Sequence, residues 1–337
     1  MRVAVPRLLL PCITLSAGLV IALAAPARAA AAAEKFSFTT NWYAQAEHGG
    51  FYQALAAGLY AKEGLAVSLK MGGPQVNIMQ LLAAGQTDCV MGYDMQTFSA
   101  WEQGIHAVTV AAAFQKDPLV LIGHPGVTDR LEDLKGKTLL ISPAGYTVQW
   151  PWLKAKYMLK EEQKRPYTFS IQPFIADKNV VQQGYLSSEP YAIEKEAKFK
   201  PRVFLLSDHG WPPYSTTIVC MEKTIKQRPQ AVAAFVKASM QGWKDYLKGD
   251  PGAANAMIKK DNPVMTDDRI AVGIRLLNES GMVFGGDAAK LGVGIVTDQR
   301  MKATYDTMVA LKQLDPKKVE LKRTYTTQFV RDLKILP

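Results

Sequence analysis

The sequence has 337 residues, of which 48% are hydrophobic, and a formal net charge of +10. This is the composition of an ordinary globular protein. Lysine and arginine alternate with acidic residues, as in "KEEQKR" (160–165), so the positive charge predicts solvated faces and excludes a nucleic-acid-binding stripe.

Residues 1–29 predict a cleaved secretory signal peptide. Arg2 and Arg7 precede an apolar run, and Ala27-Arg28-Ala29 has the small-residue pattern of a cleavage site. A membrane anchor is the alternative, since about 18 apolar residues could just span a bilayer. Small residues continue into the cleavage motif and no further apolar span follows, so we favour export to the periplasm.

Two cysteines, Cys89 and Cys220, lie beyond this segment. Export would permit a disulfide between them, but two cysteines are not a disulfide framework. Both lie in apolar, strand-like runs, where isolated cysteines behave as small buried hydrophobic residues. We therefore favour two unpaired thiols and leave the disulfide as the alternative.

The first part of the remaining chain alternates predicted strands and helices. Strands are predicted at 35–42, 65–73, 88–94, 106–114 and 118–126, and helices at 49–64 and 75–86. In the first helix Phe51, Leu55 and Leu59 recur at helical spacing, and Gly64 supplies a stop. This βαβαβ start predicts one side of a doubly wound α/β lobe.

The second part continues the alternation and then becomes mainly helical from Pro229. Strands are predicted within 131–145, 180–198 and 201–223 and at 167–174, and helices at 146–162 and after the strand within 180–198. No Gly-Ser linker divides the chain. We therefore expect two lobes joined by strands that cross near "DPLVLIG" (117–123) and "PPYSTTIV" (212–219).

Motifs of the common enzyme classes are absent from the sequence. It has no P-loop, no dinucleotide-binding glycine motif, no nucleophile elbow and no Cys/His group with metal-ligand spacing. Paired carboxylates remain possible as general acids and bases. The sequence therefore disfavours an enzyme without excluding one, and we expect no metal and no cofactor.

The loops after the predicted strands share a residue pattern. Ligands of open α/β sheets gather at the carboxyl ends of the strands. These loops are "NWYAQAEHGGFY" (41–52), "GGPQVN" (72–77), "GYDMQTFSAW" (92–101), "SPAGYTVQWPW" (142–152), "GYLSSEPY" (184–191) and "SDHGWPPYST" (207–216). They hold five of the six tryptophans and not one lysine or arginine.

A cation-free, aromatic site suits a flat, neutral or weakly basic heterocycle. Stacking on aromatic faces contributes about 1–3 kcal/mol per ring in nucleobase systems, and a carboxylate can orient an amino group. A sulfonate or nitrate site would often carry arginine or lysine, although helix N-termini can replace them. Core packing is the alternative role for each tryptophan.

Three segments resemble one family. "HGGFYQALAAGLYAKEGLAVSLKMGGP" (48–74), "LEDLKGKTLLIS" (131–142) and "GDPGAANAMIKKDNP" (249–263) are similar to type II periplasmic solute-binding proteins of ABC importers for sulfonates, nitrate and thiamine pyrimidine precursors. The resemblance implies an α/β fold of two lobes, each a mostly parallel sheet flanked by helices. We place lobe 1 at 34–120 and 216–337 and lobe 2 at 121–215.

The same resemblance implies a function without turnover. The lobes would close on a small solute by hinge motion, and the closed form would deliver it to a membrane permease. We expect a monomer. An alkanesulfonate, taurine or nitrate binder is the alternative within the family. An exported pyrimidine-synthesising or -modifying enzyme is the alternative outside it, because His48 adjoins Glu47.

Within the family, the "NW…H…GFY" opening, the GGP turn and "GYLSSEP" look most like binders of aminopyrimidine precursors. This implies ligand contacts from Asn41, Trp42, His48 and Glu189. Loop position adds Gly72, Gly73, Tyr93, Asp94, Ser142, Tyr146, Tyr185, Trp211 and Tyr214. Related fungal enzymes on this fold carry a cysteine-rich motif, which this sequence lacks.

Several of these residues have a structural alternative. His48 could cap the first helix, Asp94 could cap a later one, and Glu189 could be an N-terminal helix charge. The two glycines could serve only the turn.

Overall fold

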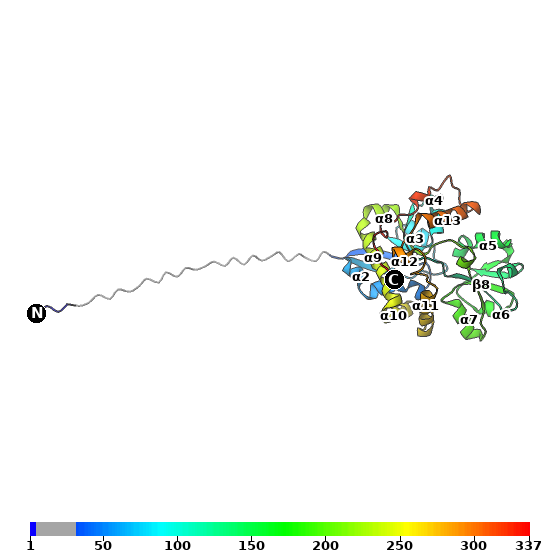
Figure 1. The fold of residues 1–337 in the computed structure, drawn as a ribbon, viewed down its shortest axis with the longest axis horizontal. Coiled ribbons are helices and arrows are strands. Elements are labelled where there is room, and N and C mark those ends of the chain that lie inside the picture. Colours follow the sequence, from blue (N-terminus) through cyan, green and yellow to red (C-terminus); the bar gives the residue numbers. More distant parts are fainter. Residues whose placement is uncertain (5–31) are drawn as a thin grey trace. The chain divides into compact units, whose positions relative to one another are not determined.

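The computed structural model describes residues 1–4 and 32–337 and divides into a unit of residues 1–32 and a unit of residues 33–337. The predicted signal peptide at 1–29 therefore lies almost entirely outside the described residues. Within the described part of the chain, no helix is long and apolar enough to cross a membrane. The second unit contains two β-sheets with helices packed around them (Figure 1).

The first sheet has the strand order β2-β1-β3-β10-β4. Its strands are β1 (Glu34–Thr39), β2 (Leu65–Lys70), β3 (Cys89–Gly92), β4 (Ala107–Phe114) and β10 (Ser215–Met221). The helices between its first four strands are α1 (Gly49–Ala56), α2 (Leu59–Lys62), α3 (Ile78–Ala83) and α4 (Asp94–Glu102). We call this sheet with its helices the first lobe.

The second sheet has the order β7-β6-β8-β5-β9. Its strands are β5 (Leu119–Gly123), β6 (Thr138–Ile141), β7 (Lys164–Pro166), β8 (Val180–Tyr185) and β9 (Arg202–Leu205). Its helices are α5 (Trp150–Tyr157), α6 (Gln172–Ala176) and α7 (Glu189–Ala197). We call this sheet with its helices the second lobe. The lobe boundaries in the chain, 34–120 with 216–337 and 121–215, stay a prediction.

Both sheets are mixed, whereas the sequence predicts mostly parallel ones. In the first sheet β2, β1 and β3 run parallel, but β10 is antiparallel to β3 and to β4. In the second sheet β5 is likewise antiparallel to β8 and β9. Because β5 and β10 each enter a sheet from the other lobe, they do not follow the helical crossover that makes strands parallel.

The strand predicted at 167–174 is also wrong. The chain leaves β7 at Pro166 and forms α6 from Gln172, with a proline in its first turn. The alternating apolar residues Tyr167, Phe169 and Ile171 suggested a strand, but Pro173 is preorganised for a helix start. Tyr167, directly after β7, is buried although it is not part of a strand.

Six helices follow β10: α8 (Glu222–Gln227), α9 (Pro229–Lys248), α10 (Gly252–Asp261), α11 (Asp267–Glu279), α12 (Ala288–Leu291) and α13 (Asp298–Ala310). The long helix α9 packs on α1 and fixes the place of the Gly49-Gly50 pair. A Cβ on Gly49 would lie 2.0 Å from the Tyr246 ring, and one on Gly50 would lie 2.2 Å from the Trp243 ring. These glycines therefore allow two helices to approach closely.

The chain passes from the first sheet to the second between β4 and β5 and returns between β9 and β10. The two crossings contact each other, because the indole Nε1 of Trp211 donates to Asp117 Oδ2 at 2.7 Å. Arg300 from α13 donates to the backbone oxygens of Gln115 and Pro212, one in each crossing. These two crossing segments, which we call the hinge, are thus also held by α13.

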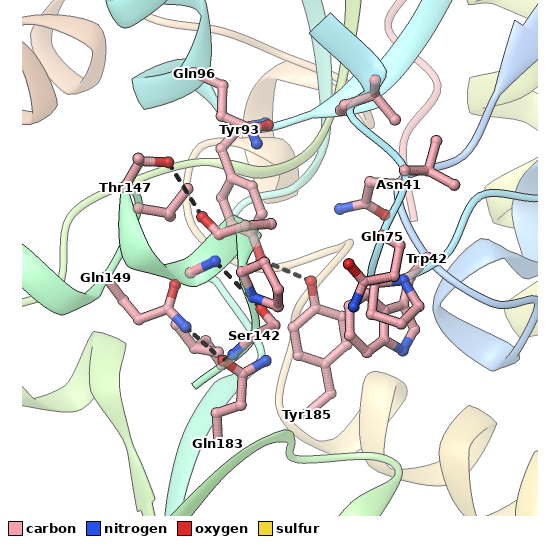
Figure 2. Close-up of a pocket in the computed structure, with 18 of the residues that line it drawn as sticks. Asn41, Trp42, Gln75, Tyr93, Gln96, Ser142, Thr147, Gln149, Gln183 and Tyr185 are labelled. Carbon is pink, nitrogen blue, oxygen red and sulfur yellow. Dashed lines mark hydrogen bonds between the residues drawn. The ribbon is translucent and has the colours of Figure 1, made fainter. Parts of the chain in front are cut away.

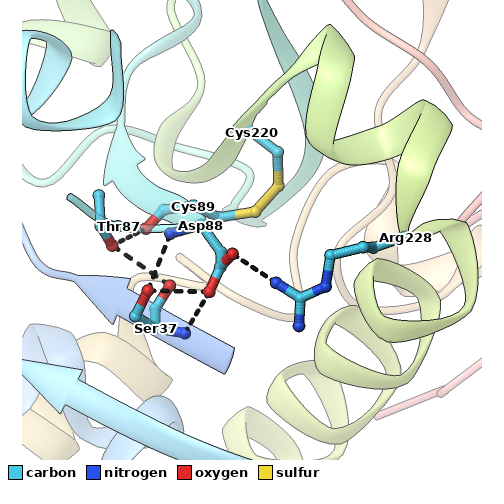
Figure 3. Close-up of a disulfide and its surroundings, with 6 residues drawn as sticks. All are labelled: Ser37, Thr87, Asp88, Cys89, Cys220 and Arg228. Carbon is cyan, nitrogen blue, oxygen red and sulfur yellow. Dashed lines mark hydrogen bonds and ion pairs between the residues drawn. A yellow bond between two sulfur atoms is a disulfide. The ribbon is translucent and has the colours of Figure 1, made fainter. Parts of the chain in front are cut away.

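Cys89 and Cys220 form a disulfide, so the expectation of two free thiols is wrong (Figure 3). They are paired residues on the neighbouring antiparallel strands β3 and β10, and both are completely buried. The two cysteines are 131 residues apart in the sequence, so their pairing cannot be predicted locally. It depends on β10 returning to lie beside β3. Next to the disulfide, Asp88 accepts from the amide and hydroxyl of Ser37 and pairs with Arg228.

Candidate ligand-binding site

A cavity of about 310 Å³ lies between the two lobes, in the size range of small-molecule sites (Figure 2). The first lobe lines it with residues that follow β1, β2 and β3. The second lobe lines it with the 142–149 segment after β6, with the end of β8 and with the start of α7. The cavity thus sits where ligands bind in open α/β sheets.

Six of the thirteen residues singled out in the sequence line this cavity: Asn41, Trp42, Tyr93, Ser142, Tyr185 and Glu189. The other seven do not: His48, Gly72, Gly73, Asp94, Tyr146, Trp211 and Tyr214. The six come from both lobes, so the cavity joins segments that are far apart in the sequence.

Aromatic side chains from both lobes meet at the cavity. The hydroxyl groups of Tyr93 and Tyr185 are 2.6 Å apart and form a hydrogen bond between the lobes. The Trp42 ring of the first lobe lies parallel to the Tyr167 ring of the second, at 6.5 Å and 14°. Trp42 also meets the edge of Phe169 at 6.1 Å. The tryptophan after β1 is therefore held by the second lobe as well as exposed to the cavity.

Glu189 is the only carboxylate in the lining and is fixed by two donors. Its Oε1 accepts from the Tyr167 hydroxyl, and its Oε2 accepts from the Tyr185 backbone amide, both at 2.8 Å. Burial raises its pKa above the ordinary value. It is also the first residue of α7, so the helix charge considered as its structural alternative applies as well.

The lining otherwise carries no charge. Among the described residues that line the cavity there is no lysine, arginine or histidine. Seven side-chain amides take their place: Asn41, Gln45, Gln75, Asn77, Gln96, Gln149 and Gln183. Except for Asn41 these were not singled out in the sequence, although all but Gln183 lie in the cation-free loops listed there. The large number of amide side chains in those loops is the sequence signal that could have identified them as lining residues.

Residues next to the cavity have structural roles. His48 is fully buried, and its Nδ1 accepts from the Gln45 amide at 3.3 Å. A Cβ on Gly72 would lie 2.1 Å from the Thr40 oxygen, so this turn requires glycine. Gly73 lies against the Tyr43 ring, 3.2 Å from where a Cβ would be.

The other four lie behind or beside the cavity. Asp94 is buried at the start of α4, where it accepts from the Tyr214 amide at 3.2 Å. The Tyr214 ring itself is covered by Arg300 at 4.0 Å. Trp211 belongs to the hinge, and Tyr146 lies under Lys164 at 4.3 Å.

Glu47 and His48 do not form a dyad facing the cavity. The Glu47 carboxylate accepts a hydrogen bond from Ser187, which precedes α7 in the second lobe. Further contacts join α7 to α11: Asp268 accepts from Tyr191 and Lys195, and Arg269 pairs with Glu196. Glu47 is therefore part of the contact between the lobes.

A family model for NMT1/THI5-like proteins matches residues 45–254. The chain belongs to this family. It is 22% identical over 276 residues to a formylaminopyrimidine-binding protein of Halalkalibacterium halodurans, covering 77% of this chain and 82% of the relative. It is 25% identical over 296 residues to a riboflavin-binding protein of Chloroflexus aurantiacus, covering 83% of this chain and 81% of the relative.

The fold agrees with these matches. The periplasmic aliphatic sulphonate-binding protein of Escherichia coli superposes with a TM-score of 0.62, at 14% identity, over 86% of this chain and 91% of that chain. The predicted two-lobed periplasmic binding protein fold is thus confirmed. One enzyme, a 4-amino-5-hydroxymethyl-2-methylpyrimidine phosphate synthase of Aspergillus parasiticus, is 24% identical over 108 residues, 32% of either chain.

Buried titratable groups between and behind the lobes have shifted pKa values. Burial raises the pKa values of Glu47, Asp94 and Asp117 to about 7. Burial also lowers the pKa of His48 to about 3. Between the ordinary carboxyl pKa and about 7, the folded protein therefore holds protons on three carboxyl groups that the unfolded chain has released.

These shifts predict higher stability at mildly acidic than at mildly alkaline pH. Because the folded state binds more protons, the free energy of unfolding falls as pH rises through this window. Below its ordinary pKa, His48 makes the free energy of unfolding rise with pH, because the unfolded chain protonates it and the folded protein does not. This opposing effect comes from one group, whereas three carboxyl groups act in the other direction. We expect a melting temperature at least about 5 °C higher at about pH 5.5 than at about pH 8. Calorimetry should show a flatter profile for Glu47→Gln, and a wild-type profile that rises with pH would contradict the assignment.

Proposed function

We propose that this chain is exported and captures a small aromatic N-heterocycle, of the kind of a thiamine pyrimidine precursor, for an ABC permease. The observation that carries this proposal is the cavity lining, which combines Trp42, Tyr93 and Tyr185 with seven amides and no cationic side chain. Aromatic faces and neutral polar groups recognise flat heterocycles by stacking and hydrogen bonding.

The curated relatives and the cavity support the same ligand class. The two relatives matched over most of the chain are named for a formylaminopyrimidine and for riboflavin, which are both nitrogen heterocycles. A cavity of about 310 Å³ is at the lower end of small-molecule sites and favours one ring over three. A sulfonate or nitrate remains the second candidate, because solved sulphonate binders share this fold. Such an anion would have to be held by neutral donors, the side-chain amides and the hydroxyls of Ser142 and Thr147.

An enzymatic role is less well supported. The candidate dyad Glu47 and His48 is buried outside the cavity, where the Glu47 carboxylate accepts from Ser187 and His48 Nδ1 accepts from the Gln45 amide. No group of three or more potential metal ligands occurs among the described residues. We therefore propose binding without turnover, by a monomer whose lobes close on the solute.

Isothermal titration with a small ligand panel tests the proposal. The panel consists of 4-amino-5-hydroxymethyl-2-methylpyrimidine, its formylaminopyrimidine relative, riboflavin, taurine and nitrate. We expect an aminopyrimidine to bind at micromolar concentration or below, and taurine and nitrate not to bind. Binding of taurine with no response to any heterocycle would overturn the ligand class. Recovery of the pyrimidine chemically changed after incubation would overturn the absence of turnover.

A further inference from the structure

Two glutamines face each other's lobe across the cavity and share one feature: the protein fixes the orientation of their amides. Gln96 lies on α4 in the first lobe, and Gln183 lies on β8 in the second. The Oε1 of Gln96 accepts from the Tyr93 backbone amide at 3.1 Å. The Oε1 of Gln183 accepts from the Ser142 backbone amide at 2.8 Å and from Gln149 Nε2 at 2.9 Å (Figure 2).

A backbone N–H can only donate, which decides how each amide must point. If either glutamine were turned over, its NH₂ group would face the N–H of Tyr93 or Ser142, and two donors would oppose each other. The Ser142 amide therefore fixes Gln183, and the Gln183 oxygen in turn requires Gln149 to present its nitrogen. The orientation follows from the backbone and does not depend on any ligand.

The Nε2 groups of Gln96 and Gln183 are the donors left over. Neither nitrogen makes a hydrogen bond to a described residue. Neither is among the fully buried polar atoms that lack a partner, so both are accessible. Both therefore open into the cavity that the two side chains line. By contrast, the Tyr93 and Tyr185 hydroxyls bond to each other, and Glu189 offers only acceptors, since each of its oxygens accepts one hydrogen bond and can accept another.

We propose that Gln96 and Gln183 determine specificity as fixed hydrogen-bond donors, one from each lobe. Their ligand carries an acceptor, a ring nitrogen or a carbonyl oxygen, on each of two edges. This inference rests on the proposed function and narrows its ligand class. An amino group or a protonated ring nitrogen at either position would place donor against donor, so an aminopyrimidine would direct ring nitrogens to the glutamines and its amino group toward Glu189.

Because the two donors lie on different lobes, a ligand that bonds to both also stabilises the closed arrangement of the lobes. A molecule with acceptors on both edges bonds to both lobes only when they are closed, so it stabilises the closed state selectively. A molecule with one acceptor satisfies one donor and leaves the other buried and unpaired. Such a molecule shifts the equilibrium toward the closed state less.

Glutamate substitutions test the donors with little change in shape. Gln96→Glu and Gln183→Glu each keep an oxygen for the backbone amide and replace the free donor by an acceptor. Gln103→Glu is the matched control, since Gln103 lies at the C-terminal end of α4, is solvent-exposed and does not line the cavity. With 4-amino-5-hydroxymethyl-2-methylpyrimidine as the probe, titration should show about 10-fold or greater weakening for the first two, and less than about threefold for the control.

A ligand series on the unaltered protein provides an arm that does not depend on any variant folding. Replacing one ring nitrogen of the probe by C–H, with both compounds neutral, should weaken binding to wild type by about 10-fold. That preference should vanish in the variant whose donor faced the replaced atom.

The outcomes separate this inference from the proposed function. If wild type binds no heterocycle, both the proposed function and this inference are overturned. If wild type binds the probe but the Gln96→Glu and Gln183→Glu variants bind it as tightly as Gln103→Glu does, the inference alone is overturned. Equal affinity of wild type for the probe and for both of its C–H analogues would likewise overturn the inference and leave the proposed function intact.

Discussion

Replacing Trp42 by alanine should weaken binding of an aromatic heterocycle by about 5- to 150-fold, the equivalent of about 1–3 kcal/mol for one stacked ring. Trp42 follows β1 directly, lines the cavity and lies parallel to Tyr167 of the second lobe. Its removal would take away a stacking face for the ligand and a contact that holds the lobes together. Both losses act in the same direction, so we expect the larger part of this range.

The two contributions can be separated with matched variants. Trp42→Phe keeps an aromatic face and should lose less than about tenfold. Trp211→Phe changes a buried tryptophan in the hinge, where it is hydrogen-bonded to Asp117 and does not line the cavity. It should alter stability and leave affinity within about threefold. Unchanged affinity of Trp42→Ala, measured by titration on folded protein, would show that the ligand binds elsewhere.

Periodicity and turn residues predict most of the secondary structure, and the resemblance of three segments implies the family. The alternation of apolar runs predicts β1 to β6, β8 to β10 and the early helices at nearly their observed positions. The Gly49-Gly50 pair belongs to a segment that resembles the family, and the structure gives its physical reason. It lets α1 pack against the Trp243 and Tyr246 rings of α9, almost 200 residues later in the sequence.

Long-range pairing explains what the sequence did not reveal. Nothing local shows that β10 returns antiparallel beside β3, and the disulfide between Cys89 and Cys220 depends on that pairing. The same limit applies to the site. A loop position does not tell whether a side chain faces the cavity, as Tyr93 does, or the protein behind it, as its neighbour Asp94 does.

The polar network shows this limit most clearly. Gln183 lies inside β8, just before a loop considered for binding, and only the alternation of strand side chains decides which face it occupies. Its role depends on the Ser142 amide, 41 residues earlier, and on Gln149. Composition predicted a cation-free site, but the direction of each amide required the backbone that fixes it.

Replacing Glu189 by alanine should have two separable effects, one on stability and one on binding. The carboxylate accepts from the Tyr167 hydroxyl and from the Tyr185 amide, so its loss leaves two donors in a buried place. Each unpaired donor costs about 1–3 kcal/mol, so we expect the free energy of unfolding to fall by about 2–6 kcal/mol. Denaturant unfolding monitored by tryptophan fluorescence would measure it.

The effect on binding tells a ligand contact from a structural support. Tyr167→Phe removes one of the two donors to Glu189 without changing a residue of the cavity lining, so it is the matched control. If Glu189 contacts the amino group of the ligand, Glu189→Ala should bind about 10-fold or more weakly, because hydrogen bonds to charged groups contribute about 1.5–3 kcal/mol. Tyr167→Phe should then stay within about threefold of wild type. If both variants lose stability but keep full affinity below their melting temperatures, Glu189 only positions the Tyr185 backbone. In that case the carboxylate takes no direct part in recognition.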